Sequence, residues 1–321
     1  MPTRKSPRKG SLQFWPRKRA SKFLPRVNWN AIHSNSSKNL KGFICYKAGM
    51  ISAYVKDNTP DSMTKGKKII IPATILECPK LKIFSIKFYK NDKIAKEIIM
   101  ENPDKELKRK IKLPKQNLDS AKSKIEKIKP EEYDDMRVLC YSIVKKTGIK
   151  KTPDLCEIGL SGTLEEKLNF VKEKIGKEIS VTDIFEKSGL VDLRGLTKGY
   201  GLAGPVKRFG ITLKQHKSEK GRRRPGSLGP WHPARVTFRA PMAGQLGMFT
   251  RVLYNNKIID MGKSENNQKL KNIVNFGDIK TDYLILRGSV QGPAKRQILI
   301  TSPLRESKKQ LKKNYELIEI R

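Results

Sequence analysis

Apolar and polar residues alternate along short stretches of most of this chain. An alternation with a period of two residues is typical of strands that bury one face. We therefore predict strands where this pattern occurs, at 42–55, 67–78, 81–89, 136–144, 157–160, 190–198, 248–259, 283–290 and 297–301. Many short strands with Gly-rich turns and few helices predict a mainly β fold, either a barrel or a sandwich, interrupted by an α/β insertion at about 80–190.

The clearest helical pattern begins after Thr163. Thr163 and Glu166 have the spacing of a capping box, and Gly176 is placed to end the helix. The apolar face of this helix is formed by Leu164, Leu168, Val171 and Ile175. We expect a shorter helix at 182–187, and helix with exposed connection at 91–135, where eleven acids are mixed with twelve bases.

The middle of the most basic segment of the chain, around 221–233, has no such apolar pattern. Between Asp192 and Asp260 there are fourteen Lys or Arg, ten Gly and a single acid, Glu219. Such a segment cannot bury apolar surface of its own, so it needs a polyanion to neutralise and order it. Nucleic acid is the first candidate for that partner.

The excess of positive charge is a property of the whole chain. The formal net charge is +38 over 321 residues, and the charged share of 31% exceeds the ~25% of ordinary soluble domains. A chain of this length can hold a hydrophobic core in one or two domains, with basic extensions that fold only against a partner.

The first part of the chain has the composition of a basic arm. Residues 1–56 hold thirteen Lys or Arg and no acid, and Phe14, Trp15 and Phe23 lie among them. A solvated tail is the alternative interpretation, but a tail has no use for these rings, whereas stacking on RNA bases does.

A glycine motif at 199–206 matches both the dinucleotide fingerprint and the glycine loop of protein kinases. We expect neither function. A dinucleotide site needs a helix whose N-terminus faces the phosphate, but Pro205 leads into a basic loop. A kinase needs a catalytic-loop Asp-Asn pair and an Asp-Phe-Gly motif, and the rest of the chain has neither. Glycines here instead allow sharp turns or a close approach to a phosphate. The predicted backbone-turn glycines are Gly199, Gly201, Gly204, Gly226, Gly229 and Gly244.

The sequence does not indicate catalysis. The four cysteines form no Cys-x-x-Cys pair, so we expect reduced core residues and no metal site. His33, His216 and His232 have no Ser, Cys or carboxylate at a telling position beside them. Because no catalytic, metal-binding or cofactor-binding pattern is visible, we predict no enzyme and no cofactor. No secretory signal or membrane-length apolar segment is visible either, so we predict no membrane association.

Two features of the basic segment favour contact with RNA. Trp231 lies between Gly-Pro and His-Pro dipeptides in a stretch without periodicity, which predicts the exposed or RNA-packed tip of a loop and disfavours a core position. Arg222, Arg223 and Arg224 have no adjacent acids with which to pair, which disfavours a merely solvated run of charge.

Three motifs, in their order and spacing, closely resemble the signature region of universal large-subunit ribosomal protein three. They begin Leu196-Thr197-Lys198-Gly199-Tyr200, Arg223-Arg224-Pro225-Gly226 and Pro241-Met242-Ala243-Gly244. The resemblance runs from about residue 4 to residue 303. The motifs that resemble the archaeal and eukaryotic branch of this family, and disfavour a bacterial origin, are 8–12, 16–20 and 229–234.

This resemblance implies a six-stranded barrel like that of translation-factor domains, an inserted α/β region, and extensions that penetrate ribosomal RNA. It also implies a structural protein of the large (50S) ribosomal subunit in the cytoplasm, which binds near the 3′ end of the 23S rRNA and nucleates subunit assembly. A loop that carries Trp231 corresponds to the family's tryptophan finger, which extends toward the peptidyl transferase centre. The implied neighbours are large-subunit proteins fourteen and twenty-four-e.

The pattern and the resemblance together give the expected organisation of the chain. We expect a basic rRNA-binding extension at 1–42, a barrel core at 43–90 and 190–303, an insertion at 91–189, a basic finger loop at 205–245 and a basic C-terminal tail at 304–321. The expected rRNA-binding residues are Arg4, Lys5, Arg8, Lys9, Trp15, Arg17, Lys18, Arg19, Lys198, Lys207, Arg208, Lys214, His216, Lys217, Arg222, Arg223, Arg224, Trp231, His232, Arg235 and Arg239.

One departure from the family limits what the resemblance implies. The eukaryotic branch has a modified histidine a few residues before the Arg-rich run, whereas Glu219 stands at about that position here and His216 is displaced. We therefore do not expect that modification. Two other functions stay open on the sequence, an RNA-modifying enzyme and an architectural DNA-binding protein.

Overall fold

Strands dominate the structure of this protein, as expected, and the fold is mainly β. The computed structural model describes residues 14–32, 40–101, 103–113, 121–126, 128–263 and 270–321. The chain forms two compact units, unit 1 (Met1–Phe23 with Leu196–Arg251) and unit 2 (Leu24–Gly195 with Val252–Arg321). We describe each unit separately.

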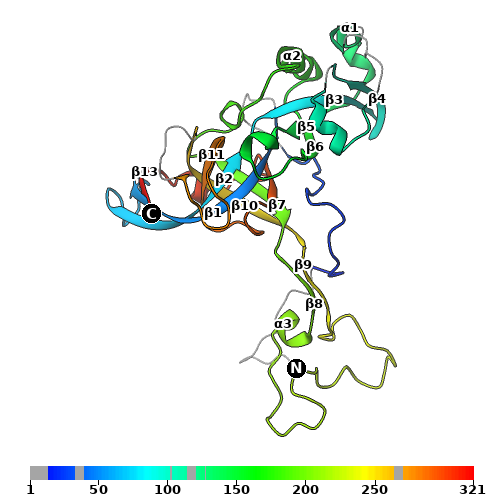
Figure 1. Ribbon diagram of the computed structural model, residues 1–321, viewed down its shortest axis with the longest axis vertical. Coiled ribbons are helices and arrows are strands. Elements are labelled where there is room, and N and C mark those ends of the chain that lie inside the picture. The colour runs from blue at the N-terminus through cyan, green and yellow to red at the C-terminus, as the bar shows by residue number, and fades with distance from the viewer. Residues whose placement is uncertain (1–13, 33–39, 102, 114–120, 127, 264–269) are drawn as a thin grey trace. The chain divides into compact units, whose positions relative to one another are not determined.

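Unit 2 is built on a seven-stranded sheet (Figure 1). Its strands are β1 (Gly42–Asp57), β2 (Lys68–Cys78), β7 (Leu190–Leu196), β10 (Thr250–Gly262), β11 (Asp282–Arg287), β12 (Gln297–Thr301) and β13 (Tyr315–Ile320). They are ordered β12-β7-β10-β11-β2-β1-β13, and β12 also pairs with β1. The pairing therefore closes into a ring of six strands, with β13 outside it on β1.

The length of β1 makes this ring possible. Its first residues pair antiparallel with β12, from Gly42 opposite Thr301, its last residues pair with β13, and β2 runs along most of its other edge. Phe43, Ile44 and Leu299 are completely buried. Burial of each such side chain stabilises the fold by about 1.5–3 kcal/mol.

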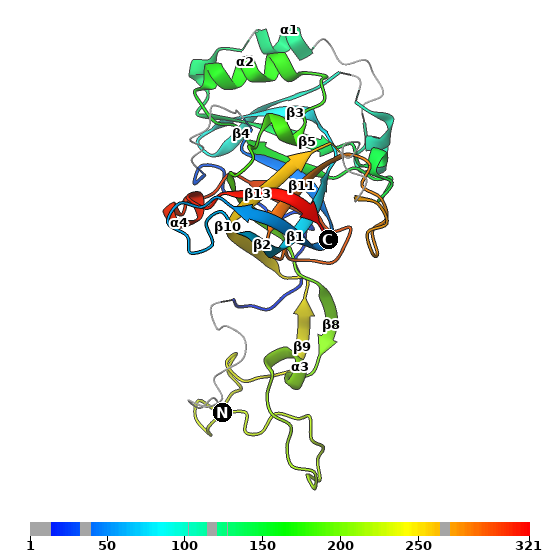
Figure 2. The ribbon, with the colours of Figure 1, turned by 90° about the vertical axis from the view of Figure 1, so that its left-hand side faces the viewer.

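A second, four-stranded sheet packs beside the ring. Its order is β4 (Lys93–Ile99), β3 (Leu81–Lys90), β5 (Asp135–Ser142) and β6 (Leu155–Gly159). Helices α1 (Ala121–Glu126) and α2 (Leu164–Lys174) cover its outer face (Figure 2). One continuous apolar core joins β1, β3, β5, α2 and β12. Short 3₁₀ turns lie at Lys105–Arg109, Pro130–Glu132, Val144–Thr147 and Val181–Asp183.

Helix α2 begins as its sequence predicts. The Thr163 hydroxyl accepts a hydrogen bond from the Glu166 amide at 3.4 Å, and the Glu166 carboxylate accepts one from the Thr163 amide at 3.0 Å. Gly176, just beyond the helix, has a φ of +71°, which a glycine adopts without strain. The capping box is therefore confirmed.

Three segments of unit 2 differ from the expectation. Residues 93–99 form strand β4 where helix and connection were expected, because Asn91 and Asp92 both have positive φ and make a tight hairpin from β3. The helix expected at 182–187 is only the 3₁₀ turn Val181–Asp183, since Ile184 and Phe185 turn into the core. Within 304–321, where we expected only a basic tail, the short helix α4 (Lys308–Leu311) precedes β13, whose Tyr315 and Ile320 are buried.

The cysteines and part of the arm belong to the core of unit 2. All four cysteines are free, as expected, and Cys156 alone among them is not fully buried. Trp29 is only 3% exposed and packs against two glycines. A Cβ atom on Gly42 would lie 2.9 Å from the Trp29 ring, and one on Gly159 would lie 2.7 Å from the Trp29 Cβ. The arm expected at 1–42 therefore contributes a core residue, which a charge-based interpretation could not show.

Candidate nucleic-acid interface

Unit 1 begins as a short antiparallel stem. Strand β8 (Gly199–Ala203) pairs with β9 (Gly244–Gly247), and Gly199 lies opposite Gly247. A Cβ atom on Gly247, whose φ is +79°, would collide with the Lys198 carbonyl. Of the six glycines expected at turns, Gly201 and Gly229 have positive φ. A Cβ atom on Gly199 would crowd the Met248 side chain, and one on Gly244 would crowd the Arg208 side chain. Space around Gly204 and Gly226 is open.

A short helix, α3 (Pro205–Phe209), follows β8 directly. This corrects our expectation that no helix opens after the glycine motif. Proline is favoured at the first position of a helix, and Gly210 ends this one with a φ of +64°. The motif still does not form a dinucleotide site, since β8 belongs to an antiparallel hairpin and not to a parallel β-α-β unit.

Arg208 of α3 holds the base of the long loop together. Its guanidinium donates hydrogen bonds to the carbonyl oxygens of Met242, Ala243 and Gln245, at 3.0, 3.3 and 3.1 Å. Burial lowers the pKa of Arg208 below its ordinary value. This expected RNA contact therefore has a structural role that the sequence did not reveal. Beside it, the Lys207 ammonium lies 4.5 Å from the centre of the exposed Tyr200 ring.

The loop itself has no core. From Gly210 to Ala243 no residue is buried. Its backbone hydrogen bonds include turns, such as Ala234 to Trp231 at 2.7 Å, and a link from Lys214 to Arg222 at 3.1 Å. The expected contact residues that are exposed on the loop are His216, Lys217, Arg222, Arg223, Arg224, Trp231, His232, Arg235 and Arg239; Lys214 is half-buried.

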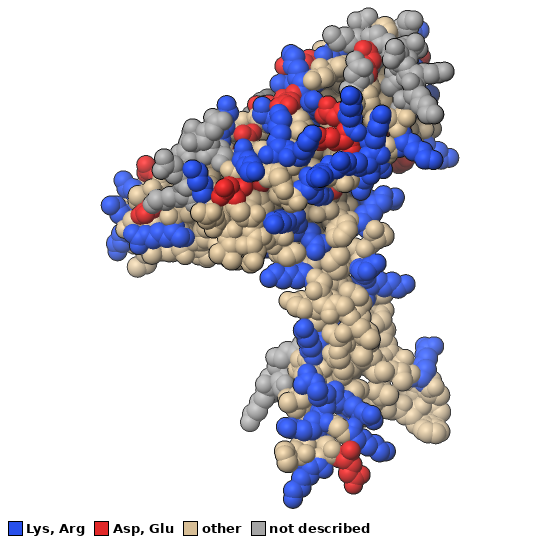
Figure 3. Space-filling model, in the orientation of Figure 1, with Lys and Arg blue, Asp and Glu red and all other residues tan. Residues whose placement is uncertain are grey.

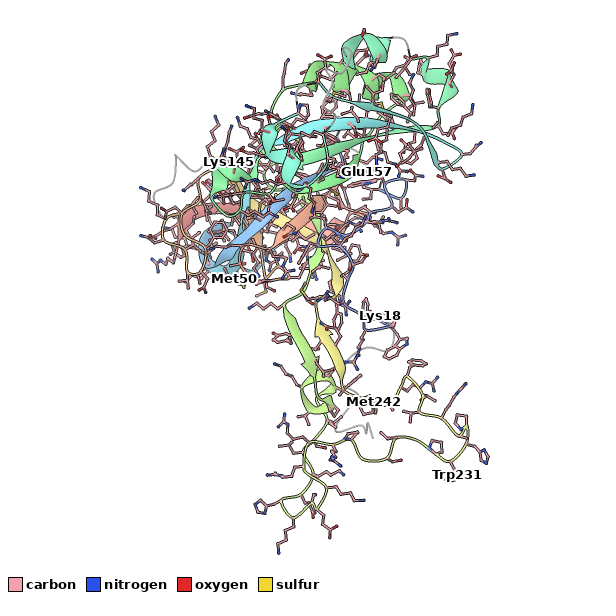
Figure 4. All side chains as sticks on the ribbon, turned by 45° about the vertical axis from the view of Figure 1, so that its right-hand side comes forward. Lys18, Met50, Lys145, Glu157, Trp231 and Met242 are labelled. Carbon is pink, nitrogen blue, oxygen red and sulfur yellow. The ribbon has the colours of Figure 1, made fainter. Side chains whose placement is uncertain are left out.

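Trp231 lies at the end of its loop and points away from the rest of the unit (Figure 4). Its side chain is 87% exposed. Exposure of so large an apolar surface is unfavourable in water. The structure thus agrees with a loop tip and disagrees with a core tryptophan.

Residues 14–23 of the arm pack within the same unit. The rings of Trp15 and Phe238 have centroids 5.3 Å apart, the Arg17 guanidinium lies 4.2 Å from the centre of the Phe209 ring, and the Ala20 amide donates to the Met248 carbonyl at 2.9 Å. Lys18 and Arg19 are exposed beside them, and Figure 4 shows Lys18 next to the stem. Four other expected contacts, Arg4, Lys5, Arg8 and Lys9, lie outside the described residues.

Positive charge is concentrated in unit 1. The unit spans 79 of the 321 residues and holds twenty Lys or Arg against one acid, Glu219, so it carries +19 of the net +38. Figure 3 shows this surface as blue and tan with very little red. Sequence reasoning missed Phe249 and Arg251, which flank the arm; the alternation of ring and cation at 249–251 repeats the signal seen at 14–19.

The described residues contain no group of His, Cys, Asp and Glu arranged to hold a metal ion. Nor does any helix in the described ranges have the length and apolar character needed to cross a membrane.

A folded β ring is joined in sequence to a cationic unit whose long loop has no buried residue. This combination defines a class of protein whose extension needs a polyanionic partner. Comparison with known proteins identifies the family. Residues 1–321 match the family model described as "Ribosomal protein L3". The chain is 39% identical over 310 residues to "Large ribosomal subunit protein uL3" of Methanocaldococcus jannaschii, covering 93% of this chain and 91% of that protein. It is 37% identical over 316 residues to the protein of the same name from Archaeoglobus fulgidus, covering 94% and 93%.

This chain therefore belongs to the ribosomal protein L3 family. The expected family and its archaeal branch are confirmed, because these relatives are archaeal. The expectation that the chain is not an enzyme is confirmed as well, since the family is one of structural ribosomal proteins.

Proposed function

We propose that this protein is a structural component of the large ribosomal subunit that binds rRNA chiefly through unit 1. The observation that carries the proposal is the absence of any buried residue between Gly210 and Ala243, in a unit with a formal charge of +19. Such a segment gains its stabilising contacts from an anionic surface around it. Helices of rRNA offer phosphates on several sides at once, as a threaded loop requires.

Within that function, we propose that residues 1–42 and 205–245 extend between rRNA helices while the β ring, a barrel like that of translation-factor domains, stays at the subunit surface. The proposed site is near the 3′ end of the 23S rRNA, where the protein nucleates assembly. Trp231, as the exposed loop tip, extends toward the peptidyl transferase centre. Proteins fourteen and twenty-four-e of the large subunit are the proposed neighbours.

The proposed phosphate contacts are the exposed cations of unit 1. Arg and Lys supply most of the affinity of such interfaces without reading sequence. The exposed cations on the stem and loop are Lys198, Lys207, Arg222, Arg223, Arg224, Arg235 and Arg239, and those on the arm are Lys18 and Arg19. We retain Arg4, Lys5, Arg8 and Lys9 as proposed contacts on the sequence alone.

Charge reversal of the arginine run tests this function. Replacement of Arg222, Arg223 and Arg224 by Glu is expected to block assembly of the large subunit, because three repulsive groups replace three attractive ones at the rRNA surface. The measurement is the sedimentation profile of ribosomal particles in cells that depend on the variant.

Folding of the β ring should not change in this variant, since all three side chains are exposed. The matched control is reversal of Lys93 and Lys96 to Glu, exposed cations on β4 of unit 2, which should leave assembly normal. Normal subunit profiles in the arginine variant would contradict the proposed role of the loop.

A further inference from the structure

Unit 1 contains a pocket that the proposed function does not use. Its volume is about 280 Å³, and it lies between the arm and residues 249–251, at the start of β10. Its lining includes Phe14, Trp15, Arg17, Lys18, Phe249 and Arg251. Pockets for drug-sized ligands occupy about 300–1,000 Å³, so this one has room for a single ring system.

The chemistry of the lining selects a flat anionic ligand. Three side chains are aromatic, three are cationic, and none is acidic. The Arg251 guanidinium is stacked 4.2 Å from the centre of the Phe14 ring and 5.3 Å from that of Phe249. An apolar peptide would gain nothing from the cations, and a small inorganic anion would gain nothing from the rings. A nucleotide has both the flat ring and the phosphate.

Exposure of the rings indicates that they are available for this contact. Phe14 is 53% exposed and Trp15 is 47% exposed, although both already contact the rest of unit 1. Half-exposed aromatic faces bordered by cations are the surfaces on which single-stranded RNA bases stack. Lys18 is exposed at the rim, within reach of a phosphate that follows the stacked base.

We propose that this pocket binds one unstacked purine of the RNA, with the base against Phe14 and Trp15 and its phosphate at Lys18. A purine is favoured because its larger ring system covers more aromatic surface than a pyrimidine does. The inference rests on the proposed function, since it names the part of the RNA that the arm receives. It adds a contact with a base to an interface otherwise made of phosphate contacts.

The test uses the full-length protein and two RNA probes. One is a short single strand with a central adenine, and the other is the same strand with that base removed. Wild-type protein should bind the adenine strand at least about fivefold more tightly, the lower end of what base stacking on an aromatic side chain contributes. Phe14→Ala and Trp15→Ala should each reduce this ratio toward one, without changing the affinity for the strand that lacks the base.

Two further variants separate stacking from arm packing. Tyr254→Ala removes an exposed ring of unit 2 that lies outside the pocket and should keep the ratio of wild type. Trp15→Tyr keeps a ring on which a base can stack, so it should keep most of the wild-type affinity ratio between the two strands. A ratio near one in Trp15→Tyr would show that Trp15 acts through packing and would overturn the proposal.

The outcomes distinguish this proposal from the proposed function. Equal affinity of wild-type protein for the two strands would overturn the base pocket alone, whereas failure to bind either strand would contradict the proposed function. Free adenosine monophosphate should compete poorly with the adenine strand, because it lacks flanking phosphates. Competition at the same concentration as the strand would reassign the pocket to a free nucleotide.

Discussion

At the scale of single residues, exposure distinguishes aromatic side chains that stabilise the fold from those available to bind a partner. A tryptophan that stabilises a fold is buried, as Trp29 is at 3% exposure, whereas Trp231 is 87% exposed. Removal of an exposed side chain away from special contacts changes the free energy of unfolding by less than about 0.5 kcal/mol. Trp231 therefore contributes little to the stability of the isolated chain.

Trp231→Ala should leave both the unfolding midpoint of the isolated protein and subunit assembly nearly unchanged. Handling of tRNA or of translation factors by ribosomes that carry the variant should change, because the loop tip extends toward the catalytic centre in our proposal. Translation fidelity and drug sensitivity are the measurements. Unchanged values of both would refute the role of the tip.

Asp57, at the end of β1, gives a residue-level prediction about pH. Burial opposes ionisation of this carboxylate, but hydrogen bonds donated by the Thr59 amide at 2.9 Å, the Thr64 hydroxyl and the Ser62 hydroxyl at 3.0 Å outweigh it and lower its pKa to about 2. A depressed pKa stabilises the folded state above the unfolded value near 4, and this contribution is lost as pH falls toward 2.

Asp57→Asn should therefore reduce the free energy of unfolding by at most about 2 kcal/mol at pH 7. The difference from wild type should shrink between pH 4 and pH 2, as measured by denaturant unfolding at each pH. Asp61→Asn, an exposed position in the same hairpin, is the control and should have little effect. A pH-independent difference for Asp57→Asn would show that the hydrogen bonds do not depend on the charge.

At the scale of elements, α3 and the stem set the shape of the loop base. The Arg208 guanidinium joins the helix to three carbonyl oxygens at residues 242–245, where the chain enters β9. A lysine ammonium cannot reproduce this fork of planar donors. The geometry of the loop base thus depends on one side chain.

Arg208→Lys is expected to loosen the start of β9. Hydrogen exchange of the amides at 244–247 should become about tenfold faster, which corresponds to the loss of about one hydrogen bond to a charged group. Amides of the β ring should exchange as in wild type. The control is Lys207→Gln, at the exposed neighbour of Arg208 on α3, which should leave the exchange rates of these amides unchanged. The same increase in exchange rate in both variants would mean that the loss of a positive charge is responsible.

Elements with strong local signals could be predicted from the sequence. Alternating apolar residues place β1, β2, β3 and β12 within a few positions, and the Thr163 capping box places α2, because these patterns arise from burial of one face. Strand β4 was missed because most of its side chains are exposed and its register comes from the hairpin with β3. Strand β13 was missed because charged residues surround it and its partner on β1 is far away in the sequence.

Prediction of the candidate site was uneven for a similar reason. Charge and glycine content mark the segment around Arg222 to Arg224, since both are local properties of the sequence. The pocket at Trp15 depends on contacts between the arm and Phe249 or Arg251, which are more than two hundred residues away. The structural role of Arg208 likewise depends on carbonyl groups that composition cannot locate.

At the scale of the whole molecule, charge and core are divided between the two units. Unit 2 holds two extended apolar clusters and buries its own surface. Unit 1 carries half of the net charge on about a quarter of the residues. Like charges at this density repel one another and oppose a compact state, so we expect the loop of unit 1 to need counterions or RNA to hold one shape.

The salt dependence of binding to large-subunit rRNA tests this account most directly. If about ten cations neutralise phosphates, the affinity should fall with a log–log slope of about −7 to −9 against salt concentration. Replacement of Arg222, Arg223 and Arg224 by Gln should make the slope shallower by about 2 to 3, since three contacts are removed. A wild-type slope near zero, or one that the triple variant leaves unchanged, would contradict the claim that phosphates order and hold unit 1.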